Sequence, residues 1–380
     1  MQAALHWMSA EPLYDGEGSG FLYLPQAAIL HVPFALLGHP LGSIVWRGVT
    51  IGVFAFGLSR LCQFSRHRNP AQVFFLATLI ALPNCVSAAR NGQTTLLLTG
   101  LMMLTVHGLA HARWNFCAVC LSAAIAFKPS VAPFLLTVAA LHRPLWGRLL
   151  LGGMIVGAFP YLTQHRSYVT EQYQAFANSF IVTIDHHKSH PFAHMFGMFE
   201  AFGWSVARPI QSVVSAVMGM LTLLVVWSCQ RRLPVARYAV YAFTISVGYL
   251  LLFNPRTENN TYAMLAPAMG LFFAESVVAR HLARRAMILG AIAVGMLMSY
   301  EAAVRIAPGV YPIWLSTLMG CCFMAVLGKV LLDEFRVPEN VAPEEQLEFV
   351  ARSPQRSPLT ARRPHEPYSL ETPAIVHTNP

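Results

Sequence analysis

Charged residues are scarce in this chain. Asp, Glu, Lys and Arg make up only 11% of its 380 residues, whereas hydrophobic residues make up 55%. A soluble domain carries about 25% charged residues, so this sequence cannot cover a water-exposed globular surface. Its apolar runs are about 17–25 residues long, which is the length that spans a bilayer. The composition therefore predicts an all-α polytopic integral membrane protein.

Acidic residues and paired cysteines are also few. The chain has 17 acidic and 26 basic residues, and the resulting net charge of +9 fits basic loops on one side of a membrane rather than nucleic-acid binding. Cys117 and Cys120 lack a second cysteine pair and a nearby histidine, which favours helix packing over metal or redox chemistry. We therefore expect no metal and no cofactor.

Residues 1–40 precede the long apolar runs. Residues 1–10 are typical of neither a signal peptide nor a first span, and 11–20 form an acidic, glycine-rich loop. The apolar piece at 21–37 is short and contains Pro33, which is expected to break it. A piece of this length suits a helix at the membrane interface. The sequence predicts an extracytoplasmic loop and interfacial helix over 1–40.

Membrane spans are predicted from residue 41 to residue 332. The predicted spans are 41–61, 71–88, 94–110, 149–162, 207–229, 236–253, 262–279, 286–304 and 310–332. Lys128 and Pro129 interrupt the apolar run 115–141, so we expect a broken pair of short helices that enters and returns. Residues 164–205 form the longest polar insertion, and 333–380 are predicted to be a disordered tail.

The positions of the arginines predict the orientation. Five basic loops fall on one side, which the positive-inside rule makes cytoplasmic: 63–70, 111–114, 142–148, 230–237 and 280–285. The C-terminal tail joins them. The extracytoplasmic side of a bacterial plasma membrane then receives the polar segments 11–20, 82–95, 164–205 and 254–261. We expect the active face there.

The segment 82–95 is a polar turn between two apolar runs. Gly92 permits a positive φ angle, and Arg90, Asn91 and Gln93 supply a cation and two amides. Such a turn is costly between hydrophobic helices unless it lines a water-filled cavity or binds a ligand. A short hydrated hairpin turn is the alternative that these residues alone leave open.

Five motifs in order carry a family resemblance: Phe21–Pro25, Trp46, Gly92–Gln93, Lys128–Pro129 and Asn254–Tyr262. Together they resemble the polyprenol-phosphate-sugar-dependent glycosyltransferases of family 87, in the GT-C superfamily. The resemblance covers about residues 10–330. It implies a GT-C-like multi-helix bundle with extracytoplasmic loops and short interfacial helices.

The resemblance also implies an activity. Such enzymes move a hexose, often mannose, from a polyprenyl-phosphate carrier to a glycan or lipid acceptor by an inverting displacement. A carboxylate in the first outer loop acts as the base. In family members this carboxylate is usually an Asp that lies ahead of the residues matching Leu13 and Tyr14. In this sequence the position of that Asp would fall before Met1. Thr95 stands where the family commonly has Asn.

The chemistry alone requires cations for the phosphate and a base for the acceptor hydroxyl. The candidate catalytic residues are Asp15 and Glu17, the carboxylates nearest to the missing Asp. The candidate substrate-binding residues are Arg47, Arg90, Asn91, Gln93, Lys128, Arg256, Glu258 and Asn259. Glu258 and the histidines of 186–194 are further candidate bases.

Several alternatives stay open. Arg47 could extend to the lipid headgroups, and Arg256 could pair with Glu258. His186, His190 and His194 share helical spacing, although Pro191 disturbs that helix and disfavours a metal site. The alternative functions are a transporter or flippase of lipid-linked sugars and an inactive, shortened homologue that serves as a scaffold. A transporter would be expected to show a second helix break that matches Lys128.

Overall fold

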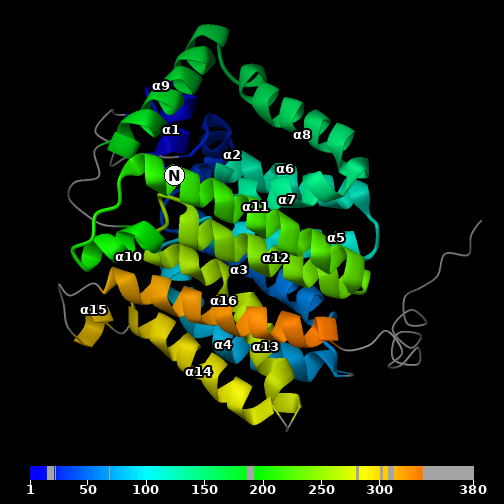
Figure 1. The fold of residues 1–380 in the computed structure, drawn as a ribbon. Coiled ribbons are helices and arrows are strands. Elements are labelled where there is room, and N and C mark those ends of the chain that lie inside the picture. Colours follow the sequence, from blue (N-terminus) through cyan, green and yellow to red (C-terminus); the bar gives the residue numbers. More distant parts are fainter. Residues whose placement is uncertain are drawn as a thin grey trace, which may run out of the picture. The chain divides into compact units, whose positions relative to one another are not determined.

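A computed structural model describes residues 1–14, 21, 23–67, 69–185, 192–279, 282–299, 303–306 and 312–336 of the protein (Figure 1). Within this described part, helices are joined by turns and short loops. Residues Met1–Leu332 form one compact unit, and Asp333–Pro380 form a second. Residues 337–380 of the predicted tail lie outside the described residues.

The first half of the chain forms α1 (Gln2–Met8), α2 (Pro25–Leu36), α3 (Leu41–Cys62), α4 (Pro70–Arg90), α5 (Thr95–Ala110), α6 (Trp114–Phe127), α7 (Ala132–Leu141) and α8 (Trp146–Ala158). The second half forms α9 (Arg166–Asp185), α10 (Met195–Ala201), α11 (Arg208–Arg232), α12 (Val235–Phe253), α13 (Ala266–Val278), α14 (Ala283–Leu297), α15 (Ala303–Ile306) and α16 (Ile313–Arg336). Short 3-10 turns are η1 (Pro129–Val131), η2 (Arg143–Leu145), η3 (Phe159–Leu162) and η4 (Asn259–Met264).

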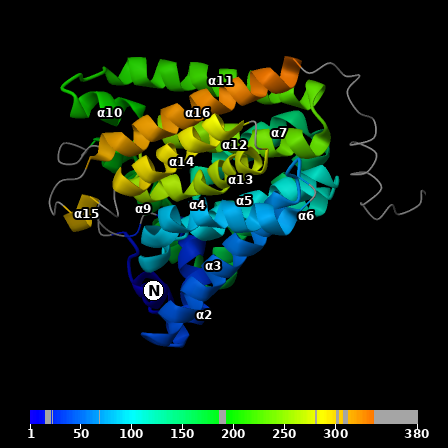
Figure 2. The same cartoon turned by 90° about the horizontal axis from the view of Figure 1, so that it is seen from below.

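The prediction of an all-α polytopic membrane protein is confirmed. Six helical segments in the described part are long and apolar enough to cross a membrane: Leu41–Cys62, Pro70–Arg90, Arg143–Leu162, Arg208–Arg232, Val235–Phe253 and Trp314–Arg336. The central α12 is buried along most of its length (Figure 2), whereas α8 lies at the edge of the bundle (Figure 1). The side chains of Leu150, Leu151 and Ile155 on α8 are exposed. Exposed apolar rows of this kind are stable in lipid rather than in water.

Two of the predicted spans are shorter than expected. The segment 262–279 begins with η4, so that α13 starts only at Ala266, and α5 has 16 residues. Helix α5 thus covers the predicted span 94–110 except for its first residue, and it is buried along most of its length. A Cβ atom on Gly57 would lie 2.8 Å from the carbonyl oxygen of Gly100, so the two glycines let α3 and α5 approach at backbone distance.

Proline interrupts the helices at one of the two places where a break is predicted. The predicted break at Lys128 is confirmed, because α6 ends at Phe127 and Lys128 is extended. In contrast, α2 continues through the exposed Pro33, and α4 continues through Pro83 as far as Arg90. The polar turn is therefore much shorter than 82–95. The side chain of Asn84 donates to the carbonyl of Ile80, which helps to satisfy the backbone beside Pro83.

The insertion 164–205 is largely helical. It begins with α9, which has 20 residues, and it also contains α10. His186 and His190 lie outside the described residues.

Successive long helices alternate in direction, so their loops gather at two ends. At one end, which we call the basic end, lie the loops after α3, α5, α7, α11 and α13. His67 Nε2 contacts the carbonyl of Glu275 at 3.0 Å, His142 Nε2 contacts the Tyr238 hydroxyl at 2.9 Å, and Gln230 donates to the carbonyl of Leu141. The loops predicted to share one side thus lie together. Which side of the membrane they face remains a prediction.

A buried ion pair holds the basic end together. The guanidinium of Arg237 on α12 donates to both carboxylate oxygens of Glu275 on α13, at 2.8 and 2.9 Å. The same carboxylate accepts from the backbone N–H of Arg66, and Arg237 lies over the rings of Tyr241 and Phe272. The sequence analysis assigned no role to Glu275. Because both charged groups are removed from water, each depends on the other.

We expect Glu275→Gln to destabilise the fold strongly, because it leaves the buried charge of Arg237 without its partner at a cost of about 3–5 kcal/mol. The measurement is thermal unfolding in detergent micelles. Glu171→Gln, at an exposed position on α9, is the matched control and should unfold like the wild type. An Arg237→Met and Glu275→Met double variant should lose less stability than either single change. Additive losses would contradict this account.

Candidate functional site

The polar turn lies at the end opposite to the basic end and follows α4 directly. Gly92 has a φ of +61°, as predicted, and its N–H donates to the carbonyl of Ala89 while Asn91 N–H donates to that of Ser87. These bonds close the C-terminus of α4. The turn therefore consists of residues 91–94.

Side chains from the first part of α3 donate hydrogen bonds to this turn and to the end of α4. The indole N–H of Trp46 donates to the carbonyl of Gly92 at 2.7 Å. Arg47 donates through Nε and Nη2 to the carbonyl of Arg90, at 3.1 and 2.9 Å, and through Nη1 to that of Ser43. A cation is favoured at a helix C-terminus, where carbonyls lack partners. Arg47 thus binds the helix end rather than extending only to lipid headgroups.

A cavity of about 240 Å³ lies beside this contact. It is lined by Met1, His31, His39, Ser43, Trp46, Arg47, Asn91 and Gly92. Two of the predicted substrate-binding residues, Arg47 and Asn91, thus share one cavity. Its volume is slightly below the roughly 300–1,000 Å³ of small-molecule sites. The cavity has room for one small polar group, such as a sugar ring or a phosphate.

Aromatic rings connect this cavity to Lys128. His31 lies 4.4 Å from Trp46 between ring centroids, and Phe127 lies 5.8 Å from both rings. Lys128 follows Phe127 directly, and its ammonium group lies 5.5 Å from the centre of the Tyr23 ring. The helix break therefore places Lys128 directly after a ring that packs on His31 and Trp46 of the cavity wall, with its ammonium group beside Tyr23.

Helix α9 contacts Leu13, and the next residue, Tyr14, is bonded to Tyr23. Leu13 N–H donates to Gln172 at 2.9 Å, and the Tyr14 hydroxyl donates to the carbonyl of Tyr23 at 2.7 Å. Burial raises the pKa of Tyr14, so this hydroxyl stays protonated as a donor at neutral pH. Farther along α9, the carbonyl of Ser179 accepts from Arg256 at 3.4 Å. Burial lowers the pKa of Arg256, which nevertheless remains a cation.

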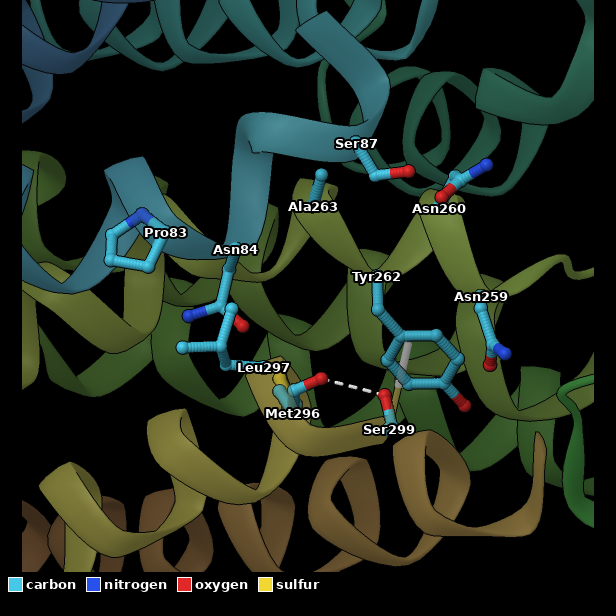
Figure 3. A pocket seen from close by; sticks show the side chains of 10 residues that line it. All are labelled: Pro83, Asn84, Ser87, Asn259, Asn260, Tyr262, Ala263, Met296, Leu297 and Ser299. Atoms are coloured by element: carbon cyan, nitrogen blue, oxygen red, sulfur yellow. Dashed lines mark hydrogen bonds between the residues drawn. The ribbon is translucent and has the colours of Figure 1, made fainter. Parts of the chain in front are cut away.

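A second, much smaller pocket of about 20 Å³ lies between α4, η4 and the end of α14 (Figure 3). Its polar lining side chains are Asn84, Ser87, Asn259, Asn260, Tyr262 and Ser299. Asn259 accepts from the Ser316 hydroxyl, which also contacts Ser299 at 2.6 Å. This volume has room for about one water molecule. Asn259 is thus held by neighbouring hydroxyls, in a pocket apart from the cavity of Arg47.

The remaining predicted residues are more dispersed. Arg90 and Glu258 have exposed side chains, and Gln93 does not line either pocket. No ion pair joins Arg256 to Glu258 within the described residues, so this alternative is not supported. Asp15 and Glu17 lie outside the described residues.

His194 has a structural role in the described chain. It is buried, and its Nδ1 accepts from the backbone N–H of Gly197 at the start of α10. Among the described residues, no group of three or more His, Cys, Asp or Glu side chains is placed to hold a metal. The other histidines of 186–194 are His186, His187 and His190, and they lie outside the described residues.

The sequence analysis missed His31, His39 and Ser43 as cavity residues. A single histidine within the otherwise apolar α2 was the available signal for His31. For His39 and Ser43 no local signal exists, because they reach the cavity only through the packing of α2 on α3.

Comparison with known proteins adds one match. The family model described as glycosyltransferase family 87 matches residues 21–255, which include α2–α12. The matched residues therefore contain the polar turn, the helix break and every cavity-lining residue except Met1. No curated protein and no solved structure matches the chain.

We expect Gly92→Ala to destabilise the protein by about 1–2 kcal/mol, because a residue with a Cβ atom is strained at positive φ. A Cβ atom would meet only ordinary contacts, with Trp46 Cδ1 at 3.5 Å, so the cost lies in the backbone. The control is Gly52→Ala in α3, where a Cβ atom meets nothing within 4 Å. This control should gain roughly 0.5–1 kcal/mol. Equal unfolding temperatures for the two variants would refute the strain.

Proposed function

Since the chain belongs to glycosyltransferase family 87, we propose that this membrane glycosyltransferase moves a hexose from a polyprenyl-phosphate carrier to a glycan or lipid acceptor. Mannose is the first sugar to test. The transfer is an inverting displacement in which the acceptor oxygen attacks the anomeric carbon and the lipid phosphate leaves. The single observation that carries the proposal is the cavity lined by Arg47, Asn91 and Gly92 beside the turn at 91–94.

The cations near this cavity suit a phosphate leaving group. A guanidinium has five N–H donors, and Arg47 directs three hydrogen bonds to backbone carbonyls, so further donors remain for a ligand. Lys128 follows Phe127, whose ring packs on Trp46, and supplies a second cation. Donors and cations fixed in place before the reaction stabilise the charge that develops on the leaving phosphate. Arg256, Arg90 and the amides of Gln93 and Asn259 are assigned to more distant parts of the donor and acceptor.

The surface next to the cavity supports a lipid carrier. The chain between α2 and α3 contributes His39 to the cavity wall, and the neighbouring Leu36, Leu41 and Ile44 are 67%, 52% and 62% exposed. Exposed apolar side chains on a membrane protein face the acyl chains. A polyprenyl tail could therefore lie along α2 and α3 while its phosphate enters the cavity.

The orientation of the reaction follows from the arginine distribution. The basic end is assigned to the cytoplasm, so the cavity and the turn face the extracytoplasmic side of a bacterial plasma membrane. Residues 1–40 then lie on the extracytoplasmic side, with α2 at the interface, and the C-terminal tail lies in the cytoplasm. Asp15 and Glu17 remain the carboxylates proposed from the sequence as bases.

The direct test is transfer of radiolabelled hexose from a polyprenyl-phosphate donor in membranes that contain the protein. We expect Lys128→Ala and Arg47→Ala to lower kcat about 10²–10³-fold, since each removes a donor from the developing phosphate charge. Arg256→Ala tests the more distant cation. Arg143→Ala, an exposed change at the basic end, is the matched control and should keep the wild-type rate.

A second arm tests the carrier itself. A nucleotide-linked hexose should not replace the polyprenyl-phosphate donor, because it has no apolar tail to lie along α2 and α3. Absence of transfer by the wild type across a panel of lipid donors and acceptors would contradict the proposed function. Equal rates in Lys128→Ala and Arg143→Ala would contradict the assignment of the phosphate to this cavity.

A further inference from the structure

The small pocket of Figure 3 contains two buried polar atoms that have no hydrogen-bond partner among the described residues. They are the hydroxyl oxygen of Ser87 on α4 and the side-chain oxygen of Asn260 on η4, and both residues line the pocket. Ser87 is only 4% exposed, so bulk water does not supply its partner. A buried polar group without a partner is costly, and the pair therefore points to a small polar ligand in this pocket.

The other polar side chains of the pocket offer both donors and acceptors. The side-chain nitrogen of Asn84 donates to the carbonyl of Ile80, which leaves its oxygen as an acceptor. The side-chain oxygen of Asn259 accepts from Ser316, which leaves its amide N–H groups as donors. None of the described lining residues is charged. A cation needs acceptors and an anion needs donors, whereas a hydroxyl group uses both, so this neutral and mixed lining suits a hydroxyl.

The volume of the pocket limits the ligand to one such group. About 20 Å³ has room for about one water molecule, and hence for one hydroxyl of a larger molecule whose remaining atoms stay outside. A whole sugar ring does not fit. The pocket is thus suited to reading a single position of a polyhydroxylated ligand.

Helix α4 connects this pocket to the cavity of Arg47. Asn84, Ser87 and Asn91 have the spacing i, i+3 and i+7, so they share one face of the helix. The first two line the small pocket, and Asn91 lines the cavity. The N–H of Asn91 donates to the carbonyl of Ser87, which makes the two residues one helical turn, or about 6 Å, apart along the axis. The two pockets are therefore separated by about the width of one hexose ring.

We propose that the small pocket is a subsite for one hydroxyl group of the donor hexose, with Ser87 and Asn260 as its specificity-determining residues. The inference rests on the proposed function. A hexose whose phosphate lies beside Arg47 and Asn91 extends from that phosphate by one ring, which matches the separation of the pockets. The sugar oxygen accepts from the Ser87 hydroxyl, and the sugar hydroxyl donates to the side-chain oxygen of Asn260.

This arrangement gives the two pockets different tasks. The cavity with its cation binds the phosphate, which is common to all such lipids, whereas the neutral pocket binds the sugar. A site that is built to hydrogen-bond a substrate hydroxyl discriminates against an analogue without it, because the protein groups are then left unpaired. Ser87 and Asn260 position the ring and select the hexose, and neither exchanges a proton or a bond with it.

The experiment measures binding, so it requires no acceptor. Thermal unfolding in detergent is followed with polyprenyl-phosphate mannose and with polyprenyl phosphate that lacks the sugar, and the concentration dependence of Tm gives each Kd. The wild type should bind the mannosylated lipid more tightly. Ser87→Ala and Asn260→Ala should each weaken binding of the mannosylated lipid about 3–10-fold, the usual loss for one neutral hydrogen bond. Neither should change binding of the lipid without sugar.

Ser246→Ala is the matched control. Ser246 is another buried helical serine whose hydroxyl has no partner within the described chain, but it lines neither pocket. Its replacement should leave both Kd values unchanged. Arg47→Ala should weaken binding of both lipids, because both carry the phosphate. Unfolding without ligand shows whether each variant is folded.

A set of donor lipids, each lacking one hydroxyl of the mannose ring, tests the same contact on the wild type itself. One of these deoxy donors should bind the wild type about 3–10-fold more weakly than the parent donor. The same deoxy donor should bind Ser87→Ala no more weakly than the parent donor does, since both changes remove one and the same hydrogen bond. The wild-type series gives a result even where a variant fails to fold.

The outcomes are distinct. Unchanged binding of the mannosylated lipid by Ser87→Ala and Asn260→Ala, or an equal loss for both lipids, would overturn the subsite and leave the proposed function standing. A pocket that holds only a structural water molecule predicts this result. Equal binding of all deoxy donors by the wild type would overturn the subsite as well. A wild type that binds neither lipid and transfers no hexose would overturn the proposed function and the subsite together.

Discussion

The backbone carbonyls at the C-terminal end of α4 must find hydrogen-bond donors, and the candidate site is built around the way they do so. The last carbonyls of a helix have no partner within the helix, and one that is buried without a donor costs about 1–3 kcal/mol. Trp46 and Arg47 of α3 supply them to Gly92 and Arg90. This contact sets the distance between α3 and the turn. The cavity beside it therefore follows from a structural requirement of the helix end.

The two ends of the bundle satisfy their polar groups differently. At the basic end, Arg237 and Glu275 neutralise each other and leave little space. At the end with the turn, Arg47 is directed to backbone carbonyls and Asn91 is exposed beside an open cavity. A tightly paired end is suited to holding helices together. An end with cations, amides and a cavity is suited to binding a charged ligand.

The sequence predicted those features that depend on neighbouring residues. The positive φ of Gly92 and the helix break at Lys128 follow from glycine and proline chemistry alone, and both are found. The length of the apolar runs predicted the membrane class. The same local rule was wrong at Pro33, where α2 continues as far as Leu36, because the loss of one backbone donor is outweighed by the packing of the rest of the helix. The pairing of Arg237 with Glu275 and the cavity position of His31 depend on contacts between helices that no local pattern encodes.

The most direct test of the account is a structure of the protein with a non-transferable polyprenyl-phosphonate hexose. The account predicts that the phosphonate lies between Arg47 and Lys128, with the polyprenyl chain along α2 and α3 and the hexose directed towards Ser87. A phosphonate bound at the basic end, or in the small pocket of Asn259, would contradict it. The position of that one group decides whether the cavity beside the turn is the site of transfer.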